Sequence, residues 1–147
     1  MVKGSEKLHA RFKAVPKKII DDVATAMETH AEKIVVDMRR LVQKRTLALH
    51  DSIGWTWGDA PKGAITLGKV RRASDRYGRI SVTIYAGTRD KSLGDADAFY
   101  ARFQEFGTVK MTANPFFYPA WRAGRKAARS AIKRAVNRGV MRSNKKA

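Results

Sequence analysis

The sequence predicts an α+β fold: a long N-terminal helix, a small antiparallel sheet of about three or four strands, and a basic C-terminal helix. Three observations predict it. A helical apolar period runs through residues 17–43, a period of two begins near residue 52, and a helical period returns after Pro119. The 147 residues suit one domain, which we expect to span 1–138, followed by a basic flexible tail at 139–147.

The long helix at 17–43 is predicted by apolar residues that recur in steps of four and three, which places them on one helix face. They are Val23, Met27, Ala31, Ile34, Met38 and Leu41. Aspartates near its start and arginines near its end suit the helix macrodipole. A shorter helix is predicted at 4–15, before Pro16.

Three strands are predicted, at 52–57, 63–71 and 79–86, because apolar and polar residues alternate there. Polar turns separate them, and such short links favour an antiparallel meander. A polar loop should follow at 87–97.

Two further helices are predicted toward the C-terminus. A brief one at 98–106 would be capped by Asp97 and ended by Gly107. The last, at 119–138, would start at Pro119. Its apolar side consists of Trp121, Ala128, Ile132, Ala135 and Val136.

Charge is the unusual feature of the composition. The net charge is +18, and residues 106–147 carry 11 basic groups and no acid. This asymmetry indicates contact with a polyanion, although a solvated cationic helix is the plainer alternative. The candidate contact residues are Arg122, Arg125, Lys126, Arg129, Lys133, Arg134, Arg138 and Arg142.

Catalytic, metal and cofactor sites are not predicted. The chain has no cysteine, and its three histidines are far apart in the sequence. Phosphate-loop, dinucleotide-binding and nucleophile-elbow motifs are missing. Asp90, Asp95 and Asp97 do not match a calcium loop and are better explained as a solvated loop. No apolar run is long enough to span a membrane, and no signal peptide is expected.

Glu105 lies in an aromatic segment, between Phe103 and Phe106. A carboxyl group in such surroundings can act as a catalytic acid. Glu105 has no partner carboxylate nearby in the sequence, so a salt bridge or a hydrogen bond to the backbone is the better interpretation.

The aromatic segment at 99–121 holds eight Phe, Tyr or Trp residues. Core packing is the first interpretation, with several rings shared at a subunit interface. Base stacking is an alternative that would require exposed rings beside a basic groove.

This segment resembles a family of tail-completion, or head–tail joining, proteins of long-tailed bacteriophages and prophages. Tyr100–Thr108 resembles the family's Y-A-x-x-x-E-F-G-T stretch, and Pro115–Ala120 resembles its P-F-x-x-P-A opening of a helix. Leu49–Ile53 is similar to its L-x-x-S-I step. Lys44–Leu49 departs from the family's P-x-x-T-G-x-L turn, because it keeps the threonine without the proline and glycine.

The resemblance implies a non-enzymatic virion protein at the neck, where a ring, expected to be a hexamer, would surround the passing double-stranded DNA. Its partners would be further copies of itself and other phage neck and tail proteins. The residues that the resemblance assigns to an oligomer interface or core motif are Tyr100, Phe103, Glu105, Phe106, Gly107, Thr108, Pro115, Phe116, Phe117 and Pro119.

Two alternatives remain open from the sequence. One is a stand-alone, sequence-nonspecific nucleic-acid-binding protein, favoured by the basic helix but lacking a known binding motif. The other is an enzyme or toxin such as a basic ribonuclease, for which the three histidines form a poor acid–base set.

Overall fold

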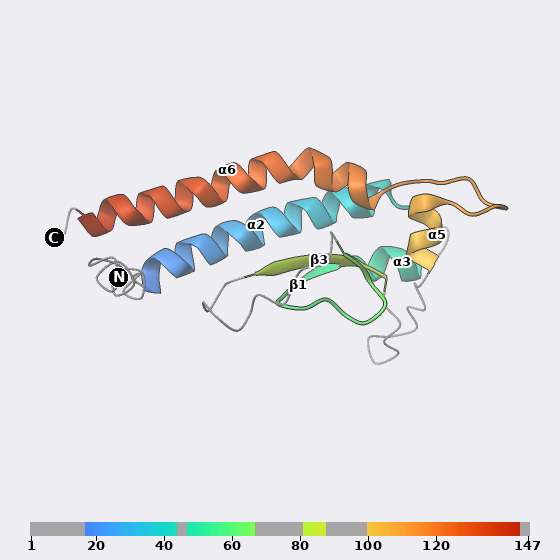
Figure 1. Ribbon diagram of the computed structural model, residues 1–147, viewed down its shortest axis with the longest axis horizontal. Coiled ribbons are helices and arrows are strands. Elements are labelled where there is room, and N and C mark those ends of the chain that lie inside the picture. Colours follow the sequence, from blue (N-terminus) through green and yellow to red (C-terminus); the bar gives the residue numbers. More distant parts are fainter. Residues whose placement is uncertain (1–16, 44–46, 67–80, 88–99, 145–147) are drawn as a thin grey trace, which may run out of the picture.

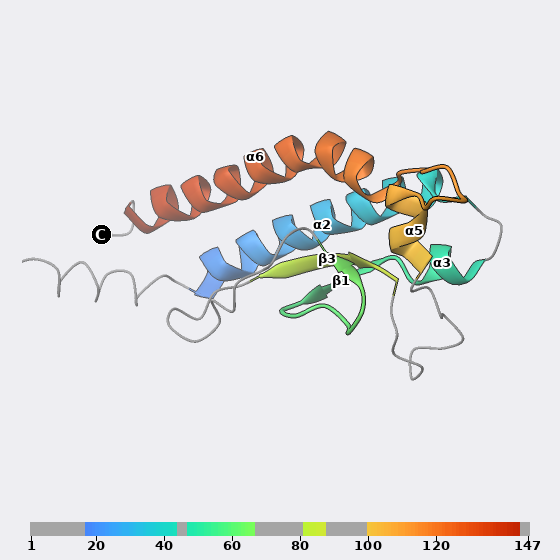
Figure 2. The same ribbon diagram turned by 45° about the vertical axis from the view of Figure 1, so that its right-hand side comes forward.

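The computed structural model describes residues 17–43, 47–66, 81–87 and 100–144. Its elements are α2 (Lys17–Leu41), α3 (Leu47–Asp51), β1 (Gly54–Trp57), β2 (Ile65–Thr66), β3 (Val82–Ala86), α5 (Ala101–Phe106) and α6 (Phe117–Asn144). Helix α6 lies along one side of α2 and the sheet lies on the other (Figures 1 and 2). The α+β prediction is therefore confirmed.

Helix α2 forms the centre of the core, as its apolar periodicity predicts. Ile34, Val35 and Met38 are each almost fully buried. They lie at spacings of one, three and four residues, so they share a helix face that meets both α6 and the sheet. The predicted span 17–43 differs from the observed one by two residues at its C-terminal end.

The sheet contradicts the predicted meander. Its strand order is β1-β3-β2, so β3 lies in the middle and pairs antiparallel with both neighbours. Alternation identifies a strand but not its partners. Beyond the β1–β3 ladder, two hydrogen bonds join the end of β1 to the start of β3: Gly58 N–H donates to Ser81 O at 2.9 Å, and Thr83 Oγ1 donates to Gly58 O.

Helix α3 was not predicted, and it explains the Leu49–Ile53 motif. The strand predicted at 52–57 begins only at Gly54, because Ser52 and Ile53 follow the end of α3. Leu49 and Ile53 are buried in the core. Between them, the buried Ser52 hydroxyl donates to Leu49 O at 2.7 Å and accepts from Gly87 N–H at 3.1 Å. Ser52 therefore connects the end of α3 to the end of β3. Arg39 on α2 donates to Ile53 O at 2.8 Å and holds the same corner.

Helix α6 packs closely against α2 because glycines lie between them. A Cβ on Gly124 would overlap Ile34 Cγ1, and one on Gly139 would lie 2.6 Å from Ile19 Cγ1. The second contact explains why α6 continues to Asn144, six residues beyond the predicted end at 138. Residues 139–144, which we expected to begin a flexible tail, remain helical because Gly139 packs against α2.

Several predictions fall outside the described residues. They are the helix at 4–15, most of the strand at 63–71, the Asp97 cap and the loop after Gly87. Within the described ranges, no helix is long and apolar enough to cross a membrane.

Candidate assembly surface and basic helix

The Glu105 carboxylate caps the N-terminus of α6 from a different helix. Its Oε2 accepts the backbone N–H groups of Phe116 at 2.8 Å and Phe117 at 2.9 Å, and its Oε1 accepts that of Tyr118 at 3.0 Å. The side chain is buried, with only 4% of the residue exposed. The expectation of a backbone hydrogen bond at Glu105 is therefore confirmed.

Pro119 completes this cap. The first four N–H groups of a helix have no partner within it. In α6 three of these donate to Glu105, and the fourth position is Pro119, which has no N–H. The negative charge also suits the positive end of the helix dipole. Glu105 and Pro119 thus act together to begin α6, because between them they account for the first four backbone positions of the helix.

The α5–α6 connection, residues 107–116, is held in one conformation by its backbone. Gly107 ends α5 with φ 75°, and a Cβ there would lie 2.8 Å from Ala113 N and 2.9 Å from Met111 O. Thr108 and Met111 form an antiparallel bridge. Asn114 N–H donates to Gln104 O at 2.8 Å. Gly107 therefore both ends the helix, as predicted, and makes room for the returning chain.

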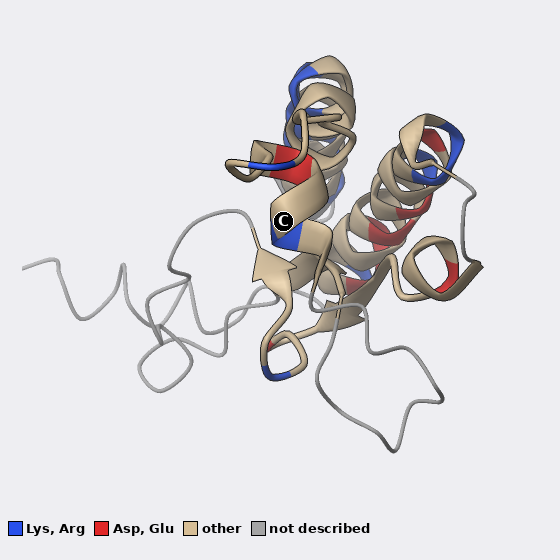
Figure 3. Ribbon diagram, turned by 90° about the vertical axis from the view of Figure 1, so that its right-hand side faces the viewer, with Lys and Arg blue, Asp and Glu red and all other residues tan. Residues whose placement is uncertain are grey.

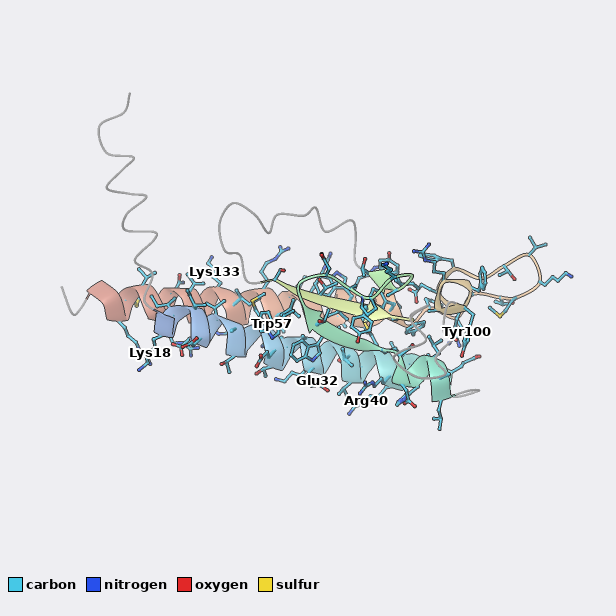
Figure 4. All side chains as sticks on the ribbon, turned by 90° about the horizontal axis from the view of Figure 1, so that it is seen from below. Lys18, Glu32, Arg40, Trp57, Tyr100 and Lys133 are labelled. Atoms are coloured by element: carbon cyan, nitrogen blue, oxygen red, sulfur yellow. The ribbon has the colours of Figure 1, made fainter. Side chains whose placement is uncertain are left out.

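Helix α5 and the connection project beyond the end of α2 (Figures 1 and 4). Together they present apolar side chains to solvent. Val109 is fully exposed, Phe106 is 64% exposed, and Phe103 and Met111 are each 44% exposed. We call these four residues the apolar tip. An open groove of about 690 Å³ lies beside them, lined by Tyr100, Phe103, Gln104, Met111, Asn114 and other residues.

The structure divides the predicted motif residues into two groups. Phe116 and Phe117 are fully buried, Glu105 holds the helix start, and Tyr100 packs partly buried against the core. Phe103, Phe106, Thr108 and Pro115 are exposed instead. Core packing is therefore correct for only part of the segment. Val109 and Met111 are candidate interface residues that the sequence interpretation missed. Their signal in the sequence is apolar residues in the turn that follows Gly107.

The basic residues of α6 also divide into two groups. All eight candidate contact residues are exposed. Gly124 and Gly139 face α2, and helix periodicity places five of the eight on the opposite side, which we call the outer face. These five are Arg122, Arg125, Lys126, Arg129 and Lys133. Arg134, Arg138 and Arg142 line a groove between α6 and α2. Figure 3 shows blue without red along α6, whereas red follows α2.

His30 lies in that groove on α2. Burial lowers the pKa of His30 below its ordinary value of 6.5, and the positive charges of Lys33 and Arg134 lower it further. A proton is therefore bound more readily by the unfolded chain than by the folded one. It follows that the free energy of unfolding is full above about pH 6.5, the pKa of His30 in the unfolded chain, and falls as pH drops from there toward the lower pKa of the folded protein.

We expect His30→Gln to weaken this dependence, because the variant has no imidazole to protonate. Urea unfolding followed by tryptophan fluorescence at pH 5.5 and 7.5 would measure it. The wild type should lose more stability on acidification than His30→Gln. Equal losses would show that other groups cause the pH dependence.

The described residues form no metal-binding cluster. His50 Nδ1 lies 2.8 Å from Asp51 Oδ1 at the end of α3. Across 17–43, 47–66, 81–87 and 100–144, no group of three His, Cys, Asp or Glu residues could hold a metal ion.

The fold and these surfaces define a class: a small α+β protein with a buried apolar core, an exposed apolar projection and a basic helix. Comparison with known families is specific. Residues 6–107 match the family described as "Bacteriophage HK97-gp10, putative tail-component", so the chain belongs to that family. It is thus a structural, virion-associated phage tail component whose partners are other phage tail proteins. The match ends at Gly107, so the Pro115–Ala120 motif lies beyond it.

Searches of curated proteins and of solved structures found no match to this chain.

Proposed function

We propose that the protein completes the tail at the phage head–tail junction, as a homo-oligomeric ring that joins the DNA-filled head to the tail. The ring is expected to be a hexamer and to line or flank the DNA channel. The observation that supports this proposal is the apolar tip, whose four side chains are exposed to solvent. The chain belongs to a tail-component family, so a partner in the tail could cover this tip.

The apolar tip has the properties of an interface. Exposed apolar patches on soluble proteins commonly mark interaction sites. Its backbone is fixed by Gly107, the Thr108–Met111 bridge and the Asn114–Gln104 hydrogen bond, so little conformational entropy would be lost on docking. Arg102 and Lys110 are exposed nearby, whereas Glu105 is buried. The partner surface should therefore be apolar with an acidic rim.

Closure of a ring by head-to-tail contacts requires a second, different patch on the same subunit. The region from α2 to α3 offers exposed apolar side chains for it: Val36 is 37% exposed, Leu41 48% and Leu47 63%. In our proposal the tip of one copy docks against this region of the next. The basic helix α6 then faces the DNA channel or an acidic neighbouring protein.

We expect Val109→Asp to abolish ring assembly while leaving the fold intact. Val109 is fully exposed, so the substitution removes no core contact, but it would place a charge in a desolvated interface. Light scattering and negative-stain microscopy at high and low salt would report particle mass and shape, alone and with purified tails. Circular dichroism would confirm that the variant is folded.

Val140→Asp is the matched control, because Val140 is 48% exposed on the far end of α6. It should assemble like the wild type. If Val109→Asp formed the same particles as the wild type, the tip would not be the interface. A wild-type protein that neither formed rings nor bound tails, yet gripped DNA as a monomer, would favour the stand-alone nucleic-acid-binding alternative.

A further inference from the structure

The groove between α2 and α6 has a defined shape and composition. Its volume is about 380 Å³, and it lies on the part of the helix pair that extends beyond the sheet (Figure 1). One wall carries Arg134, Arg138 and Arg142. Their spacing of four residues places them in a row, about 6 Å apart along the helix axis.

The opposite wall, on α2, is built mostly of small side chains. Thr25, Ala26 and Thr29 line it, together with His30. The two threonine hydroxyls donate to carbonyls of their own helix, at 3.0 Å and 2.8 Å. Because these side chains are small and their hydroxyls already donate within α2, a bound group could approach the arginine row closely.

The groove has one acidic side chain among the residues that line it. Asp22 Oδ2 lies 3.5 Å from Arg142 Nη1, and both side chains are partly exposed. A pair of this kind contributes little to stability and is readily broken. Arg134 and Arg138, beside His30, leave an excess of positive charge facing the groove.

We propose that this groove binds the phosphate backbone of double-stranded DNA. Arginine forms paired hydrogen bonds to phosphate oxygens, and the row would meet successive phosphates of one strand. The residues lining the groove include no Phe, Tyr or Trp on which an unpaired base could stack. Duplex DNA holds its phosphates in a regular array of high charge density, which suits a fixed row of cations better than a flexible single strand does.

This proposal rests on the proposed function in choosing DNA as the polyanion, but it assigns the contact to the groove rather than to the outer face. In this proposal Asp22 competes with DNA for Arg142, and a bound phosphate would displace the Asp22 carboxylate from the Arg142 side chain. His30 becomes a reporter, because a nearby phosphate favours its protonated form and so raises its pKa.

The test is fluorescence anisotropy of a labelled 20-base-pair duplex with the full chain, titrated at several salt concentrations. Arg134→Gln combined with Arg138→Gln should weaken binding about tenfold and reduce the salt dependence by about two phosphate contacts. The matched control, Arg125→Gln with Arg129→Gln, removes the same charge from the outer face and should weaken binding much less. Equal losses would overturn the groove assignment.

A second pair of variants acts in the opposite direction. Asp22→Asn should strengthen duplex binding about threefold, because it frees Arg142 and removes a charge that repels phosphate. Asp21→Asn makes the same change one residue away, outside the groove, and should have a smaller effect. Equal effects of the two would contradict the proposal.

NMR titration of the His30 ring gives a readout independent of affinity. Duplex DNA should raise the pKa of His30, and an unmoved pKa would overturn the proposal.

Ring assembly and head–tail joining are scored separately from DNA binding. A groove variant that loses DNA binding but still assembles supports the groove, whereas normal groove binding by a chain that never assembles would contradict only the proposed function.

Discussion

Glu105→Ala should lower the free energy of unfolding by about 3–4 kcal/mol, more than loss of a single cap, which typically costs about 1 kcal/mol. Three backbone N–H groups donate to this carboxylate, and the residue is 96% shielded from solvent. Alanine would leave two of these donors in a buried position and remove a favourable charge from the helix N-terminus. Glu105→Gln should lose less, because its amide oxygen can still accept.

Urea unfolding followed by circular dichroism would measure both variants. Glu32→Ala is the control, because Glu32, labelled in Figure 4, is exposed and accepts a hydrogen bond from Trp55 Nε1 at 2.9 Å. It should cost less than about 1 kcal/mol. If Glu105→Ala cost no more than Glu32→Ala, the remote cap would contribute little to stability.

For Glu105, the sequence predicts the need for a hydrogen-bond partner but not the identity of that partner. A lone acid among aromatic residues must be paired or hydrogen-bonded if it is buried, and that requirement can be read from composition. The partner cannot, because the three donors lie 11 to 13 residues away, across a turn whose geometry depends on Gly107. The long helices were predictable for a different reason: their periodicity records which face is buried.

Other features depend on tertiary contacts that no local pattern encodes. The placement of β3 at the centre of the sheet follows from pairing on both of its edges. The division of the basic helix follows from where α2 lies, which turns Arg134 and Arg138 toward the groove and leaves Arg125 and Arg129 outside. The aromatic segment divides likewise, since Phe116 and Phe117 meet the core while Phe106 does not.

The α2–α6 contact provides the second large effect. We expect Gly124→Val to lower the free energy of unfolding by about 3 kcal/mol. A Cβ at Gly124 would overlap Ile34 Cγ1 and lie 3.0 Å from Ile34 Cδ1, and Ile34 is only 2% exposed. Ile34 cannot move away without disturbing the core. The gain in helix propensity over glycine, below about 1 kcal/mol, is too small to offset this overlap.

Ala127→Val is the matched control, because Ala127 is exposed on the same helix and the change should cost only its helix propensity, below about 0.7 kcal/mol. Combining Gly124→Ala with Ile34→Ala separates overlap from any general effect on the helix. Removing the Ile34 side chain creates room for the new methyl group, so the two losses should sum to more than the loss in the double variant. Strict additivity would mean that the glycine is not needed for close packing, and α6 would then be held mainly by the Glu105 cap and the buried Phe116–Phe117 pair.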